Sequence, residues 1–244
     1  MRIITCTNMN ASVPSVIDPA MLMHLFQLTD SACPVGTFSF SNGLESAAAE
    51  GLVYDAATLE AFVGEVVRLS AFTDGVAALH ALRSRSAEDE AGIFEADRRL
   101  LLCKLNDEAR QMTCRMGRKL AELAAALVGD PLLARWLEAA VRRETPGSFP
   151  VAQGVAFAAI GADERTLFCA GQYGAANTVL GAALRCVRVT HYDTQRILYR
   201  LGGRTEALYR EAAELGLDDM HAFTPQIDIL AALHEKGTQR MFMN

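Results

Sequence analysis

The sequence predicts an all-α, single-domain helical bundle of about ten helices. Proline is absent between Pro34 and Pro131 and again between Pro150 and Pro225, and a proline inside a helix costs about 3 kcal/mol. These stretches are rich in Ala, Leu, Glu and Arg, which favour helices. Apolar residues recur along them every three or four positions, as on one face of an amphipathic helix.

The clearest predicted helix begins after Asn106, whose side chain suits the N-cap position. Asp107 and Glu108 follow and suit the positive end of the helix dipole. Gly129 and Pro131 then form a stop signal. The apolar residues at helical spacing, which we expect to be buried, are Ala109, Met112, Met116, Leu120, Leu123 and Leu127.

Similar patterns predict the other helices. Thr58 is expected to cap a helix that runs toward residue 67. Further helices are predicted over about 74–85, 88–102, 151–185 with a break at 161–165, 193–215 with a kink at 202–203, and 225–233. Residues 186–190 alternate like a strand, but five residues alone cannot make a sheet. We expect residues 1–17 to be a flexible N-terminal segment and residues 18–233 to be the helical domain.

Composition limits the class of function. The 244 residues carry a formal net charge of −6 with no long run of either sign, so the basic surface that nucleic-acid binding needs is missing. No stretch approaches the roughly 20 consecutive apolar residues of a membrane span. The six cysteines are scattered, which is typical of reduced thiols in a cytoplasmic protein. We therefore expect a cytoplasmic protein that binds neither nucleic acid nor membranes.

Motifs that would carry catalysis are missing from the sequence. It contains no G-x-x-x-x-G-K-[ST] loop for nucleotide phosphates, no H-E-x-x-H and no G-x-S-x-G. The five histidines are dispersed without metal-ligand spacing. A catalytic triad or a metal site assembled from distant residues stays open, because sequence cannot forbid either. The prediction is a protein without catalysis that acts by binding other proteins.

The most unusual local segment spans residues 33–45. Pro34 and Gly36 break the preceding helix, and Asn42 with Glu45 three residues later resembles a capping box. From the residues alone, a buried connector and an interface segment are equally good interpretations.

This segment resembles the signature of the urease accessory protein UreF family. Its fixed elements are Pro34-Val35-Gly36, then Phe38, then Ser41, then Gly43-Leu44-Glu45. The helix after Asn106 is similar to the central helix of that family, which pairs an early arginine, here Arg110, with a later Met-Gly pair, here Met116-Gly117. Two later landmarks follow in order: Phe149-Pro150-Val151 with Gly154, and His234-Glu235 with Arg240-Met241-Phe242. The chain departs from the family at Thr190-His191, where members commonly carry Gly-Gln a few residues after Arg185.

The resemblance implies a UreF-like, usually dimeric adaptor without a cofactor of its own. Such an adaptor binds UreD (also called UreH) and the GTPase UreG, and the assembly docks on apo-urease for GTP-dependent nickel insertion, with nickel and GTP handled by the partner proteins. Residues 234–244 would form a partner-binding tail. The residues expected at partner surfaces are Pro34, Val35, Gly36, Phe38, Ser41, Gly43, Leu44, Glu45, Arg110, Met116, Gly117, Arg185, His234, Glu235, Arg240 and Phe242.

Two alternatives stay open. The first is an all-helical enzyme whose site is assembled from separated residues. The second is a UreF homologue that scaffolds a complex other than urease.

Overall fold

The computed structural model describes residues 18–36, 40–221, 224–235 and 241–242. Within these ranges the chain is helical and contains no strand, so the all-α prediction is confirmed. The α-helices are α1 (Pro19–Thr29), α2 (Leu44–Ala49), α3 (Ala56–Ser70), α4 (Val76–Ser86), α5 (Glu90–Leu102), α6 (Asp107–Val128), α7 (Pro131–Val141), α8 (Phe149–Ala159), α9 (Glu164–Cys186), α10 (His191–Gly202), α11 (Thr205–Ala213) and α12 (Pro225–Glu235). A π-helical turn, η2 (Ala71–Gly75), joins α3 to α4, and a 3-10 turn, η3 (Leu217–Asp219), follows α11.

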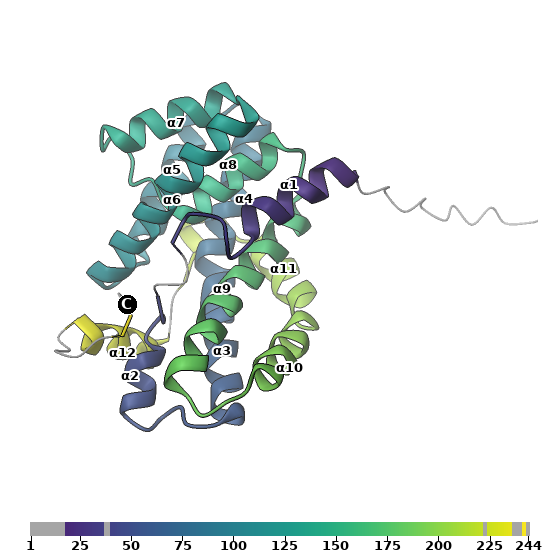
Figure 1. Cartoon of the computed structure of the whole chain (residues 1–244). Helices are drawn as coiled ribbons and strands as arrows, with labels where there is room; N and C mark the ends of the chain where they lie inside the picture. Colours follow the sequence, from purple (N-terminus) through teal and green to yellow (C-terminus); the bar gives the residue numbers. More distant parts are fainter. Residues whose placement is uncertain (1–17, 37–39, 222–223, 236–240, 243–244) are drawn as a thin grey trace, which may run out of the picture.

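Two large hydrophobic cores are stacked along the molecule and linked by its longest helical runs, and a third, smaller cluster around Phe72 and Phe168 lies among η2, α4, α9 and α11. The first core, in the upper half of Figure 1, lies among α4, α5, α6, α7 and α8 and surrounds Trp136 and Phe157. The second core, in the lower half, lies among α2, α3, α9, α10 and α12. The continuous run from α3 through η2 into α4 passes from one core to the other, and α9 packs along it. Both large cores are therefore built in part by the α3–η2–α4 run and by α9.

Helix α6 begins and ends where the sequence predicts. The side chain of Asn106 accepts a hydrogen bond of 2.7 Å from the backbone N–H of Ala109, and Gly129 ends the helix with φ of +69°. The predicted apolar stripe is only partly right, because Leu127 is 53% exposed. The buried face instead follows Thr113, Met116, Gly117, Leu120, Ala121 and Ala124.

Three other boundaries differ from the prediction. Helix α3 is capped by Asp55, with Thr58 as the third residue of a capping box. Residues 187–190 form a loop rather than a strand. Helix α12 continues to residue 235, so His234 lies in its last turn and not in the tail. The predicted break at 202–203 does separate α10 from α11.

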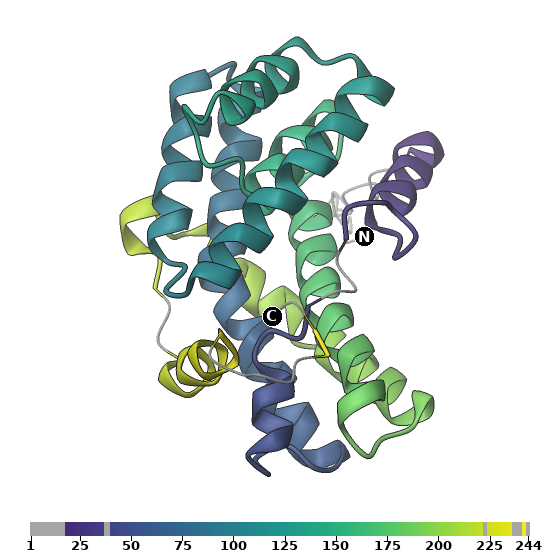
Figure 2. The ribbon, with the colours of Figure 1, turned by 60° about the vertical axis from the view of Figure 1, so that its left-hand side comes forward.

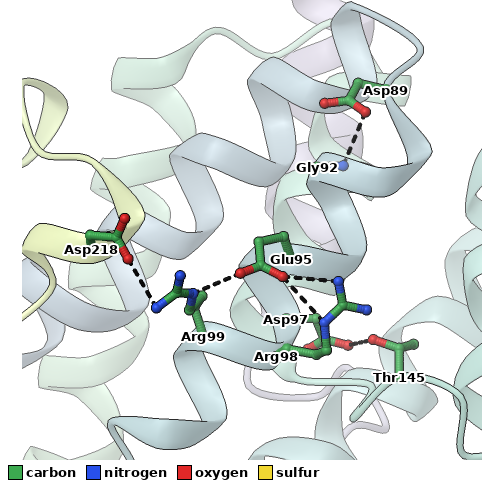
Figure 3. Close-up of polar contacts among 8 residues, drawn as sticks. All are labelled: Asp89, Gly92, Glu95, Asp97, Arg98, Arg99, Thr145 and Asp218. Carbon is green, nitrogen blue, oxygen red and sulfur yellow. Dashed lines mark hydrogen bonds and ion pairs between the residues drawn. The ribbon is translucent and has the colours of Figure 1, made fainter.

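A buried carboxylate anchors the loop between α7 and α8. Asp97 of α5 is fully buried and accepts hydrogen bonds from the hydroxyl of Thr145 (2.7 Å) and from the backbone N–H groups of Gly147 (2.7 Å) and Ser148 (2.9 Å). Figure 3 shows the Thr145 contact and, on the outer side of α5, Glu95 paired with two arginines. The anchored loop fixes the start of α8 against α6.

None of the helices in the described ranges is both long and apolar enough to cross a membrane.

Candidate partner-binding site around Glu45

The start of α2 is built by a glycine rather than by a side-chain cap. Gly43 has φ of +80°, which glycine adopts readily. A Cβ atom at Gly43 would lie 3.4 Å from the backbone nitrogen of Ala231, an ordinary van der Waals contact, so the positive φ rather than a lack of space favours glycine here. The predicted capping box of Asn42 and Glu45 is wrong, because the N-cap residue of α2 is Gly43, which has no side chain to form one. The side chain of Glu45 is used elsewhere.

The carboxylate of Glu45 binds the end of the chain. Its Oε1 accepts a hydrogen bond of 2.7 Å from the backbone N–H of Met241, and its Oε2 accepts one of 3.1 Å from the backbone N–H of Phe242. The same Oε2 lies 3.1 Å from Nε2 of His234. Figure 2 shows residues 241–242 returning to the segment that precedes α2. The first and last sequence landmarks therefore meet at one side chain.

His234 sits between two carboxylates. It is 3% exposed, its Nε2 faces Glu45, and its Nδ1 lies 2.9 Å from Oε2 of Glu108. A neutral imidazole has a single N–H, and an ionised carboxylate only accepts hydrogen bonds. Both contacts are hydrogen bonds at the same time only when the cluster of Glu45, Glu108 and His234 holds one additional proton. This cluster, the clamp, joins α2, α6 and α12.

Sequence reasoning missed Glu108 as a member of the clamp. Its position in the first turn of α6 is fully explained by the helix dipole, and it lies far along the chain from both Glu45 and His234. No spacing rule connects residues that meet only through packing, so the sequence carried no signal for this contact.

Phe242 secures the tail on the lower core. Its side chain is 5% exposed and packs into the cluster formed by α2, α3, α9, α10 and α12. The guanidinium carbon of Arg185 lies 4.9 Å from the centre of the Phe242 ring, a cation–π contact. Met241 next to it is 58% exposed. The structure thus brings together Glu45, Arg185, His234 and Phe242 from the predicted partner-binding residues.

The surroundings of Glu45 lower its pKa, whereas burial and the charge of Glu45 raise the pKa of Cys186. Burial alone would raise the pKa of Glu45, but the N–H groups of Met241 and Phe242 together with His234 lower it below its usual value. Burial and the nearby charge of Glu45 raise the pKa of Cys186 to about 11. Glu45 is therefore held as a carboxylate, the form that binds the tail.

The remaining predicted site residues are not members of the clamp. Val35 is buried in the upper core while Pro34 is exposed beside it. Gly36 has φ of +86°. Ser41 is fully buried, and its hydroxyl lies 3.5 Å from the backbone nitrogen of Glu45. Leu44 belongs to the lower core.

The three predicted residues of α6 have structural contacts. Arg110 donates a hydrogen bond of 2.7 Å to the carbonyl of Lys104, and Met116 is buried. A Cβ atom at Gly117 would lie 2.6 Å from the carbonyl oxygen of Ser148, so this glycine serves close packing against the anchored loop. Phe38 and Arg240 lie outside the described residues, and Glu235 is the last residue of α12.

A cavity of about 220 Å³ lies beside the clamp, between α9, η2, the start of α6 and α12. Its wall carries the ion pair of Lys104 and Asp74 at 2.6 Å. Gln172 also lines it, is 4% exposed, and has an Oε1 atom without a hydrogen-bond partner among the described residues. The described lining residues include no histidine.

The His–carboxylate contacts of the clamp do not form an accessible catalytic pair. His234 is buried, and both of its ring nitrogens already face carboxylates, so neither is available to a substrate. Among the residues that the structure describes, no three His, Cys, Asp or Glu side chains are placed to hold a metal ion. The geometry is that of a contact which holds a peptide segment.

Comparison with known proteins agrees with the landmarks. The UreF family model matches residues 53–202. "Urease accessory protein UreF 2" of Brucella abortus (strain 2308) is 48% identical over 244 residues, which is 100% of this chain and 99% of that protein. "Urease accessory protein UreF" of Yersinia pseudotuberculosis serotype I (strain IP32953) is 43% identical over 224 residues, covering 91% of this chain and 98% of that protein. With its helical fold and this similarity over nearly its whole length, the chain belongs to the UreF family of urease accessory proteins.

Proposed function

We propose that this protein is the adaptor of a urease maturation complex. It bridges UreD (UreH) and the GTPase UreG, and the assembly inserts nickel into apo-urease in a GTP-dependent step. It works in the cytoplasm as a homodimer, has no catalytic activity and carries no cofactor of its own. UreG and the other partners handle GTP and nickel.

The docking of the tail on Glu45 is the observation that supports this proposal most directly. One carboxylate binds two consecutive backbone N–H groups, and Phe242 fills the lower core beside Arg185. This arrangement fixes Met241 on the surface, where its side chain is 58% exposed. Exposed methionines and neighbouring arginines are frequent in protein–protein interfaces. Met241 and Phe242 therefore present a preformed contact for UreD.

The test is copurification of the tagged chain with UreD and UreG, sized by light scattering with and without GTP and nickel. We expect one assembly that contains all three proteins. Deleting residues 236–244 is expected to remove UreD, and Glu45→Ala is expected to weaken its binding. Glu50→Ala is the matched control, because Glu50 is an exposed residue at the end of the same helix.

The outcomes separate the proposal from its alternatives. If the chain binds neither UreD nor UreG, the proposed adaptor function is refuted, and an enzymatic site assembled from separated residues becomes the next hypothesis. An assembly that forms but leaves apo-urease inactive would favour a scaffold for another complex. Full UreD binding after deletion of residues 236–244 would remove the tail from the interface while leaving the adaptor role in place.

A further inference from the structure

Two aromatic side chains on helix α10 are exposed to solvent. Tyr192 is 77% exposed and Tyr199 is 86% exposed, the highest values for large hydrophobic side chains among the described residues. They lie seven residues apart, so two helical turns place them on the same face. Tyrosines combine large contact area with a polar tip and are enriched at protein interfaces. Nothing in the described part of the chain covers this pair.

The same helix is the basic part of an acidic protein. The segment from Arg185 to Arg204 contains five arginines and one aspartate, a net charge of +4, whereas the rest of the chain sums to −10. Arg200 is already engaged with Glu60 of α3, at 2.8 and 2.6 Å. Of the other four arginines, Arg185 lies over the ring of Phe242 and Arg204 lies beside Gly64 of α3, which leaves Arg188 and Arg196 as the arginines next to Tyr192 along the chain.

Two arginines flank the tyrosines and are accessible. Arg196 lies four residues after Tyr192 on the same face, with a side chain that is 68% exposed and only a 3.4 Å contact to Asp193. Arg188 is exposed just before α10, and no carboxylate among the described residues forms an ion pair with it. We call Arg188, Tyr192, Arg196 and Tyr199 the α10 face.

We propose that the α10 face docks an acidic surface of a partner protein. Aromatic contact supplies affinity, and the arginines pair with carboxylates and steer association. The excess of acidic charge elsewhere on this chain disfavours a nucleic acid, which would meet an unfavourable field over most of the molecule. Arg185, which contacts the ring of Phe242, belongs to the same basic segment of the chain as the α10 face. This inference rests on the proposed adaptor function and assigns it a second contact surface.

The experiment measures the dissociation constants of purified UreD and purified UreG for the full-length chain at 50 and 300 mM NaCl. The variants are Tyr192→Ser/Tyr199→Ser and Arg188→Glu/Arg196→Glu. The control variants are Tyr54→Ser, another exposed tyrosine, and Arg98→Glu/Arg142→Glu, which reverses the same charge on α5 and at the end of α7. All substituted side chains are exposed, so circular dichroism spectra should match the wild type.

The expected result is a selective loss of one partner. Charge reversal on the α10 face should weaken that partner at least about ten-fold at 50 mM NaCl and less at 300 mM, because salt screens exposed charges. The tyrosine variant should weaken it at both salt concentrations, and both controls should stay within about two-fold of wild type. Binding of both partners at wild-type strength by both α10 variants would overturn the inference.

A second probe keeps the inference separate from the adaptor function. When the wild-type chain binds neither UreD nor UreG, the adaptor function fails, and the variants are titrated with a fluorescent helical peptide of Glu and Leu residues. Weaker binding by the α10 variants than by their controls supports the α10 face, and equal binding overturns it. Retention of single-stranded RNA by wild type but not by the α10 variants would also overturn it, in favour of a nucleic-acid surface.

Discussion

Replacing Glu45 by glutamine tests the clamp with the smallest change in shape. The carboxylate of Glu45 binds the N–H groups of Met241 and Phe242 and faces His234. Glutamine has a single acceptor oxygen and places an NH₂ group where the second one was, so at least one of these donors loses its partner. The tail should therefore open more often.

The contacts set the size of the effect. A hydrogen bond to a charged group contributes about 1.5–3 kcal/mol, and the substitution removes the charge and at least one acceptor. We expect tail docking to weaken by about 3 kcal/mol, which corresponds to about 150-fold in the opening equilibrium. Local opening governs amide exchange when reclosing is fast, so the amides of Met241 and Phe242 should exchange about 150-fold faster.

Hydrogen–deuterium exchange of the C-terminal peptide measures this effect. Glu50→Gln is the control, since it makes the same chemical change at the exposed C-cap residue of α2 and should leave the exchange unchanged. Amides of α8 should keep their wild-type protection in both variants, because α8 belongs to the other core. Exchange at Met241 and Phe242 within about three-fold of wild type in Glu45→Gln would refute the assignment of Glu45 as the residue that holds the tail.

Three further predictions follow from burial and charge. Because the contacts of Glu45 lower its pKa, its contribution to tail docking is complete above the ordinary glutamate pKa of 4.5 and is lost as the pH falls through the lowered value. Protection of the Met241 and Phe242 amides against exchange should therefore drop only below pH 4.5. A loss of protection between pH 7 and 5 would contradict this. With a pKa of about 11, the thiol of Cys186 should be alkylated at pH 9 about fifty-fold more slowly in the folded protein than in the unfolded chain. Peptide mass spectrometry measures the two alkylation rates, and equal rates would count against the burial of Cys186. Gly117→Ala should destabilise the protein by about 1–3 kcal/mol through overpacking. A Cβ atom added at Gly171 has nothing within 4 Å, so Gly171→Ala should be neutral or stabilising by up to about 1 kcal/mol. Denaturant unfolding compares the two variants, and equal stabilities would refute the packing argument.

Much of the fold follows from local sequence patterns. The cap at Asn106 and the stop at Gly129 are local features, and both are found at the ends of α6. The split between α10 and α11 at 202–203 is likewise local, because paired glycines weaken a helix wherever it packs. Periodicity was less reliable for burial. Leu127 fits the apolar stripe of α6 but is exposed, because the buried face of α6 runs from Thr113 to Ala124 and does not include it.

Identifying the candidate site required both the sequence and the tertiary structure. The family landmarks identified Glu45, His234 and Phe242 as residues of interest, but they assigned no contact between them. The capping-box interpretation of Asn42 and Glu45 failed because the N-cap position of α2 is Gly43, whose left-handed backbone is one that glycine adopts readily. Because the carboxylate of Glu45 does not cap α2, it can bind the backbone N–H groups of Met241 and Phe242.

The sequence by itself determined an all-helical chain, its family and the main helix ends, because capping, proline placement and periodicity act over a few residues. Tertiary structure decided which carboxylates surround His234, that Glu108 is one of them, and that the tail returns to α2. These contacts join residues separated by more than 100 positions, and α2, α6 and α12 must pack first. Their energies depend on the burial of His234 between these helices, which is a property of the assembled core and of no single segment.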